Sequence, residues 1–128
     1  MRLLLDTHLL LWSMGVTRRL SRTARDLLLD PANTVLFSAA SVWEIAIKSS
    51  LRRRDFKVEL PGFVRALKRA GFSELPVRTV HAMRVAQLPD LHKDPFDRLL
   101  VAQALVEPAV LLTIDAQLRD YGPQVRVL

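Results

Sequence analysis

Cysteine is absent from the 128-residue sequence, which excludes disulfide bonds and metal sites built on thiolates. Charged residues interrupt every apolar run well before the span of about 20 residues that a membrane helix needs. The first apolar stretch carries Asp6 and His8, and no small-residue cleavage site follows it, so we expect no signal peptide. These absences predict a soluble, cytoplasmic protein that does not associate with a membrane.

Glycine and histidine are also scarce. The four glycines stand apart from one another, which excludes a P-loop and a GxGxxG nucleotide site. The three histidines, His8, His81 and His92, form neither HExxH nor another two-histidine pair on a helix, so we expect no zinc site. His92 could line the rim of a crevice, but a surface-loop position is the favoured interpretation.

Positive charge, by contrast, is in excess. Nineteen Lys and Arg residues against thirteen Asp and Glu residues give a net charge of +6. This excess favours a polyanionic partner such as nucleic acid, although a generic soluble surface can show it too. One basic cluster either forms a solvated face or follows an RNA backbone, and it comprises Arg52, Arg53, Arg54 and Lys57.

Short apolar segments that are typical of strands alternate with helical patterns along the chain. We expect strands at 2–5, at 35–38, within 72–77, at 109–115 and at 125–128. We expect helices from Thr7, over 21–29, from about Ser41, over 61–71, over 79–88 and over 95–107. This alternation predicts one three-layer α/β domain, in which helices flank a mainly parallel central sheet.

Four acidic residues follow strands or begin helices in this arrangement. Asp6 ends the first strand, and Asp115 ends the strand expected at 109–115. Glu44 comes about a turn and a half after the second strand. Asp97 lies in the first turn of its helix. Because ligands bind at the carboxyl ends of strands in open α/β sheets, all four acids can face one crevice.

Each acid also has a purely structural explanation. Asp6 and Asp115 can be N-caps, Glu44 can pair with Lys48 one helical turn away, and Asp97 can complement a helix dipole. However, four acids that converge from separate segments would repel one another unless a cation joined them. Oxygen ligands without cysteine point to Mg²⁺, or to Mn²⁺, and such sites activate water against a phosphodiester.

Several neighbours of these acids have open roles. Ser38 and Ser41 flank a helix start, where they either cap the helix or bind a substrate phosphate. Arg98 and Lys48 either hold an RNA phosphate or neutralise the acids. On the helix from about Ser41, Glu44 and Lys48 share the stripe opposite a broad apolar arc.

The two tryptophans fall on apolar arcs of their helices. Trp12 lies in the helix that begins at Thr7, and Trp43 lies in the helix from about Ser41. We expect both side chains in the hydrophobic core.

Four segments resemble the motifs of PIN-domain ribonucleases in order and spacing, and most closely those of VapC-like toxins of toxin–antitoxin pairs. They are "LLLDTHLLLW", "SAASVWEIAIK", "DPFDRLLVAQA" and "LLTIDAQL". The resemblance runs from Arg2 to the C-terminal strand and implies a single PIN domain over 1–128. It implies that Asp6, Glu44 and Asp97 hold the metal, with Asp115 as the fourth acid.

Two further positions are weighed by the same resemblance. Thr113 matches a family position that can support the site. Asp94, directly before Pro95, is placed in a loop turn and ranks below Asp97.

The resemblance further implies a metal-dependent endoribonuclease that cuts cellular RNA and leaves a 5′-phosphate and a 3′-hydroxyl. It implies inhibition by a small VapB-like antitoxin and assembly as a homodimer. A phospho-accepting receiver domain is excluded, because Asp6 stands alone after the first strand and no Lys follows Lys93. The alternative that stays open is a metal-free RNA-binding module of the same fold.

Overall fold

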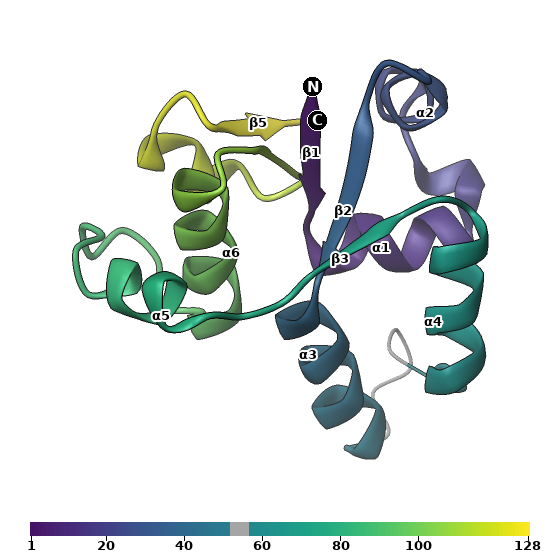
Figure 1. Cartoon of the computed structure of the whole chain (residues 1–128), viewed down its shortest axis with the longest axis horizontal. Coiled ribbons are helices and arrows are strands. Elements are labelled where there is room, and N and C mark those ends of the chain that lie inside the picture. Colours follow the sequence, from purple (N-terminus) through teal and green to yellow (C-terminus); the bar gives the residue numbers. More distant parts are fainter. Residues whose placement is uncertain (52–56) are drawn as a thin grey trace.

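The computed structural model describes residues 1–51 and 57–128 (Figure 1). The three arginines of the predicted basic cluster, Arg52 to Arg54, lie outside the described residues, whereas Lys57 is described and exposed. No helix in the two described ranges is long and apolar enough to cross a membrane.

Five parallel strands form the central sheet in the order β3-β2-β1-β4-β5. They are β1 (Arg2–Leu5), β2 (Thr34–Ser38), β3 (Ser73–Leu75), β4 (Val110–Thr113) and β5 (Val125–Val127). Leu4 of β1 is in register with Leu36 of β2 and with Leu111 of β4. All four pairings are parallel, which confirms the predicted α/β class.

Helices cover both faces of this sheet (Figure 1). On one side lie α1 (Thr7–Met14), the 3-10 helix η1 (Thr17–Arg19), α2 (Arg22–Leu29), α3 (Ala39–Ser50) and α4 (Leu60–Arg69). On the other side lie α5 (Thr79–Val85), α6 (Pro95–Val106) and the 3-10 helix η3 (Ala116–Tyr121). The predicted three-layer arrangement is therefore confirmed.

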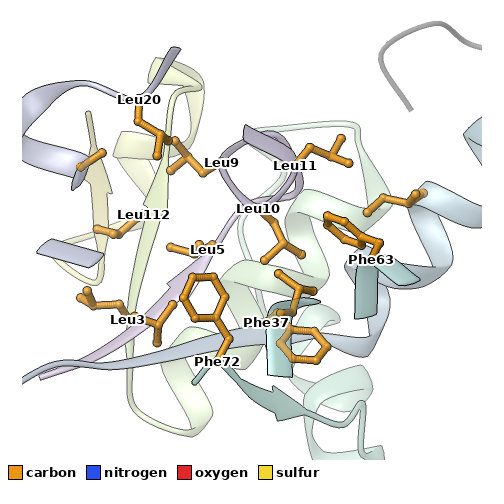
Figure 2. Packing of buried hydrophobic residues seen from close by; sticks show 14 residues of the cluster. Leu3, Leu5, Leu9, Leu10, Leu11, Leu20, Phe37, Phe63, Phe72 and Leu112 are labelled. Carbon is orange, nitrogen blue, oxygen red and sulfur yellow. The ribbon is translucent and has the colours of Figure 1, made fainter. Parts of the chain in front are cut away.

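Alternation along the strands divides the core between the two faces. Leu3 and Leu5 of β1 pack with Phe37 of β2 against α1 and α4 (Figure 2). Leu4 points to the opposite face, where it packs with Leu100 of α6. A period of two in the strands thus buries β1 on both sides, as expected for a central parallel strand.

Polar caps set where the helices begin. Asp6 follows β1 and accepts a hydrogen bond from the Leu9 amide at 2.8 Å, and Ser21 caps α2 through the Ala24 amide at 3.1 Å. Ser38 ends β2 and accepts from the Ala40 amide at 3.0 Å, so α3 begins two residues before the predicted Ser41. The predicted helix over 79–88 ends earlier, at Val85.

The predicted burial of Trp43 is wrong, because 60% of this side chain is exposed. Trp43 and Ile45 are about 200° apart on α3, so only one of them can face the core, and Ile45 does. Trp43 instead makes an edge-to-face contact with Phe96, with ring centroids 5.2 Å apart. Trp12 is half-buried and packs against the edge of the core.

A polar network around the buried His81 ties the start of β1 to the end of α6. The His81 Nδ1 accepts from the Arg78 amide at 2.9 Å, so the neutral ring carries its hydrogen on Nε2 and donates it to Glu107. Arg2 donates to the Glu107 carbonyl at 2.7 Å. The hydrogen bond from His81, together with Arg2, lowers the pKa of the Glu107 carboxyl.

We expect Glu107→Gln to lower the free energy of unfolding at neutral pH. The amide is neutral, whereas His81 and Arg2 stabilise the negative charge of the Glu107 carboxylate. The folded-state pKa of Glu107 lies below its ordinary value of 4.5, so its contribution is present above pH 4.5 and is lost as the pH falls. Thermal melts of the two proteins should differ most at neutral pH and converge in acid. Glu74→Gln, at an exposed ion pair with Lys68, is the control with little effect at any pH.

Candidate active site

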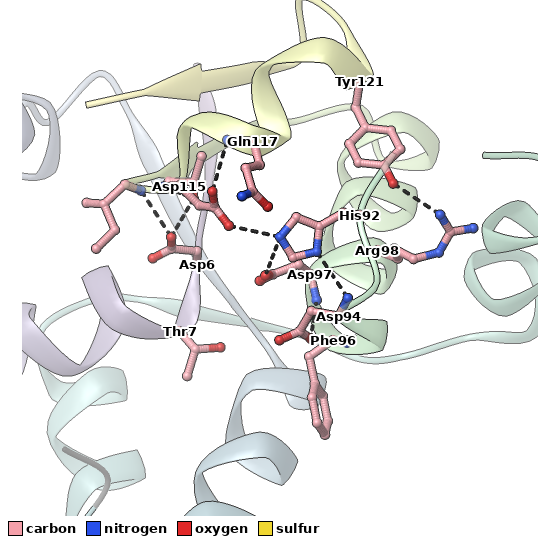
Figure 3. A network of polar contacts seen from close by, with 12 residues as sticks. Asp6, Thr7, His92, Asp94, Phe96, Asp97, Arg98, Asp115, Gln117 and Tyr121 are labelled. Atoms are coloured by element: carbon pink, nitrogen blue, oxygen red, sulfur yellow. Dashed lines mark hydrogen bonds and ion pairs between the residues drawn. The ribbon is translucent and has the colours of Figure 1, made fainter. Parts of the chain in front are cut away.

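A cavity of about 340 Å³ opens at the carboxyl edge of the sheet. It lies beside the ends of β1 and β4. After β1 the chain adds β2 and β3 on one side of β1, and it then crosses to add β4 and β5 on the other side, so strand order reverses between β1 and β4. Its lining comprises Asp6, Thr7, His8, Glu44, Lys48, His92, Asp94, Asp97, Ile114 and Asp115. The structure thus brings all four predicted acids to one pocket, part of which Figure 3 shows.

Asp6 is buried at the end of β1 and is held by three donors. Its Oδ1 accepts from the Leu9 amide, and its Oδ2 accepts from the Thr113 hydroxyl at 2.6 Å and from the Ile114 amide at 3.2 Å (Figure 3). Burial raises the pKa of Asp6 even though these hydrogen bonds lower it. Asp6 is therefore a helix cap and a pocket residue at once.

Glu44 is also buried, and the stripe that it shares with Lys48 lines the pocket. Its Oε1 accepts from the Thr7 hydroxyl at 2.6 Å, and its Oε2 pairs with Lys48, as the one-turn spacing predicted. The Thr7 hydroxyl also lies 3.0 Å from that of Ser41. The helix turns this face toward α1 because hydroxyl and ammonium donors satisfy the carboxylate there.

Asp97 lies in the first turn of α6, three residues after the helix cap Asp94. The Asp94 side chain accepts from the Phe96 amide at 2.8 Å and from the Asp97 amide at 3.2 Å, as its predicted turn role requires. Burial raises the pKa of Asp97 to about 7, and the charges of Asp94, Glu44 and Asp6 add to this rise. The acids of the pocket are therefore close enough to disfavour one another's ionisation.

Asp115 and His92 meet across the pocket. Asp115 accepts from the Gln117 amide at 2.9 Å through Oδ1, and its Oδ2 lies 2.9 Å from the His92 Nε2 (Figure 3). The His92 Nδ1 accepts from the Asp94 amide at 3.0 Å, so Nε2 carries the hydrogen of the neutral ring and donates it to Asp115. The same Nε2 lies 3.8 Å from Asp97.

His92 is thus half-buried between two acids, and its predicted position as a surface-loop residue is wrong. The segment "HKDPFD" held a signal for it, because a histidine two residues before a helix cap can accept from the cap's amide.

Thr113 joins the two strand ends that carry acids. Its hydroxyl donates to Asp6 and accepts from the Asp115 amide at 3.0 Å. The side chain is fully buried, so no water replaces these contacts. One hydroxyl therefore fixes the positions of two acids.

Other sequence candidates lie away from the pocket. Arg98 donates to the carbonyls of Pro89 and Val85 and, at 3.1 Å, to the Tyr121 hydroxyl, so it does not neutralise the acids (Figure 3). Ser38 is fully buried, caps α3 and donates to Gln103 at 2.6 Å. Its capping role is confirmed, and binding of a substrate phosphate is excluded by its burial.

The donors of the pocket fit a hard divalent cation. Within residues 1–51 and 57–128, one group of potential ligand atoms lies within 4.8 Å of one another, and it belongs to His92, Asp97 and Asp115. Asp6 and Glu44 line the same pocket outside that group. Carboxylate oxygens suit Mg²⁺ and Mn²⁺. The ionised acids repel one another, and a cation among them would offset this repulsion and so favour their ionised forms.

Comparison with known families decides the assignment of the chain. The family model described as the PIN domain matches residues 3–122. This chain belongs to the PIN domain family. The resemblance seen in the sequence motifs is thereby confirmed at the family level, whereas the search of curated proteins found no match.

Solved structures share the fold of this PIN domain over its full length. A chain of the VapBC2 complex of Rickettsia felis, bound to a promoter DNA fragment, has a TM-score of 0.72 and 16% identity, covering 100% of this chain and 98% of that one. A chain of VapBC-1 from nontypeable Haemophilus influenzae has a TM-score of 0.67 and 14% identity, with coverages of 100% and 97%. A chain of a toxin–antitoxin complex from Klebsiella pneumoniae has a TM-score of 0.59 and 19% identity, covering 97% of this chain and 95% of that one. At these identities the likeness concerns the fold alone.

Proposed function

We propose that this PIN domain is a metal-dependent endoribonuclease that acts as a VapC-like toxin. One observation carries the proposal: acids from four separate segments line one pocket at the carboxyl edge. There, burial together with the charges of Asp94, Glu44 and Asp6 raises the pKa of Asp97 to about 7. The net charge of +6 suits an RNA substrate. The fold that this chain shares with VapBC structures supports the toxin assignment.

Asp6, Glu44, Asp97 and Asp115 would hold Mg²⁺ or Mn²⁺ in this proposal. When bound, such an ion polarises a phosphodiester and lowers the pKa of a water molecule. The carboxylates are pre-oriented for the role by side chains and backbone amides that already occupy their outer lone pairs. These orienting side chains are Thr7, Lys48, His92 and Thr113.

In the proposed reaction, water attacks the phosphorus atom in line and the bond to the 3′-oxygen breaks. The products are a 5′-phosphate and a 3′-hydroxyl, and no protein side chain becomes covalently attached to RNA. Lys48 lines the pocket and contributes positive charge where phosphate oxygens approach. His92 holds the Asp115 carboxylate through its Nε2 hydrogen, which makes it a positioning residue.

The partners follow from the same assignment. We propose a VapB-like antitoxin as the inhibitor, since the matched structures from Rickettsia and Haemophilus are VapBC complexes, and a homodimer as the toxin's assembly. We also propose that the reaction takes place in the cytoplasm, since a chain without cysteine suits a reducing compartment in which disulfide bonds do not persist.

The test is cleavage of single-stranded RNA by the purified chain. We expect cutting with Mg²⁺ or Mn²⁺, no cutting with EDTA, and loss of cutting in Asp6→Asn while the circular dichroism spectrum is unchanged. An RNA-binding module of the same fold would bind RNA in EDTA and leave it intact under every condition, and that result would exclude the nuclease.

We expect Mn²⁺ to raise the Tm of the chain, because an ion that binds only the folded state stabilises it in proportion to the logarithm of its concentration. In Asp97→Asn the rise should be much smaller, since one carboxylate of the pocket is lost. Differential scanning fluorimetry across a Mn²⁺ series measures both. Equal rises in the two proteins would show that Mn²⁺ binds elsewhere.

A further inference from the structure

A second groove adjoins the acidic pocket on the side of α1. It has a volume of about 310 Å³ and is lined by His8, Leu11, Trp12, Gly15, Val16, Arg19, Lys57 and Val58. His8 also lines the acidic pocket, so the two hollows share a wall. A chain-like ligand that occupies one of them can therefore continue into the other.

The groove is lined by basic and aromatic side chains, whereas the neighbouring pocket is lined mainly by acids. Arg19 lies over the Trp12 ring, with the guanidinium carbon 5.5 Å from the ring centroid. The His8 and Trp12 rings stand edge to face, 6.2 Å apart at an interplanar angle of 62°. Arg19 and Lys57 are exposed, so the groove offers planar groups and positive charge together.

We propose that this groove binds a nucleotide of single-stranded RNA that flanks the scissile phosphate, with its base against Trp12 and Arg19 and its phosphate near Lys57. Unpaired bases stack on aromatic rings and on guanidinium planes, and cations follow the backbone. The inference rests on the proposed nuclease function, because it names how the substrate of that same site is held.

The position of the groove meets a physical need of the acidic pocket. Five acids line that pocket, and they repel RNA phosphates. Positive charge directly beside it offsets this repulsion for the neighbouring phosphate. Stacking tolerates every base because each has a flat face, so the groove would position the strand without selecting a sequence.

Tryptophan fluorescence gives a readout that is independent of cleavage. The chain has two tryptophans, and Trp43→Phe at the exposed position leaves Trp12 as the only tryptophan, so that light absorbed by tryptophan alone excites it selectively. We expect a short single-stranded RNA of mixed sequence, titrated into this variant in EDTA, to quench Trp12 emission. Arg19→Ala in the same background should weaken RNA binding by about 5- to 10-fold.

Arg69→Ala is the matched control. Arg69 is exposed at the end of α4, just before β3 begins, and so lies toward the opposite edge of the sheet from the acids. Its removal lowers the net charge by the same amount but should leave RNA affinity within about 2-fold of the parent.

Three results would overturn the inference: RNA that binds without changing Trp12 emission, RNA that does not bind, or equal losses in Arg19→Ala and Arg69→Ala. A peptide-binding groove would give one of these results. None of them bears on metal-dependent cleavage, which is measured separately. Conversely, quenching without any cleavage in Mg²⁺ or Mn²⁺ would retain the groove and refute the nuclease.

Discussion

Replacement of Asp97 by Asn is expected to reduce RNA cleavage by at least about 100-fold, since loss of even an outer-shell partner of a metal ligand costs 10- to 100-fold. The amide keeps the size of the carboxyl group but cannot supply a charged oxygen to a divalent cation. Gel-based cleavage of a labelled RNA in Mn²⁺ measures the loss. Asp26→Asn, at an exposed position of α2, is the control and should cut at the parent's rate.

The same variant should be more stable than the parent when metal is chelated. The pKa of Asp97 is raised from 3.8 to about 7 in the folded chain, so its contribution to stability is complete below pH 3.8 and is lost as the pH rises toward 7. Asn carries no charge and avoids this loss. Above pH 7 in EDTA we expect a gain of about 1 kcal/mol or more, hence a Tm roughly 4 °C higher.

Opposite signs for activity and stability are the signature of a functional acid in a repulsive cluster. In acid the two melting curves should coincide, because Asp97 is then protonated in both folded and unfolded chains. A lower Tm for Asp97→Asn at every pH would mean that the carboxylate is a structural partner, and the assigned role would be refuted.

Thr113→Val is expected to produce the second large effect, although Thr113 lies outside the lining of the pocket. Valine fills the same volume but removes the donor to Asp6 and the acceptor of the Asp115 amide. Leaving these buried groups with one partner fewer costs about 1 to 3 kcal/mol. Misplacement of two acids should also reduce cleavage by about 10- to 100-fold.

Thr113→Ser separates the hydroxyl from the methyl group. Serine keeps both hydrogen bonds, so we expect it to restore most of the activity despite losing a buried methyl. Urea melts and cleavage rates of the three proteins provide the comparison. Equal activity in the valine and serine variants would show that the hydroxyl does not position the acids.

Much of the fold could be predicted from the sequence because its strands and caps are locally encoded. "RLLL", followed by Asp6 and an apolar helix, gives both the end of β1 and the beginning of α1. The convergence of Asp6, Glu44, Asp97 and Asp115 followed from parallel topology, since every strand then ends at the same edge. No side-chain contact was needed for that prediction.

The misplacement of Trp43 has a physical cause, which is that periodicity does not say which side of a wide apolar arc is covered. Trp43 was assigned to the core and is exposed, whereas Glu44, on the stripe opposite that arc, is buried against Thr7. For His92 the surface-loop position was favoured over the crevice rim, because the contact that holds it, with Asp115, joins residues 23 apart in the chain. Such contacts become visible only when the segments are placed in space.

The most direct test of a shared divalent ion is an anomalous difference map from crystals of the chain grown in MnCl₂. We expect a single strong peak in the acidic pocket, within coordination distance of Asp97 and of at least two of the other three acids. A pocket without a peak, in which Asp6 and Glu44 keep only their bonds to Thr113, Thr7 and Lys48, would contradict the metal-dependent mechanism.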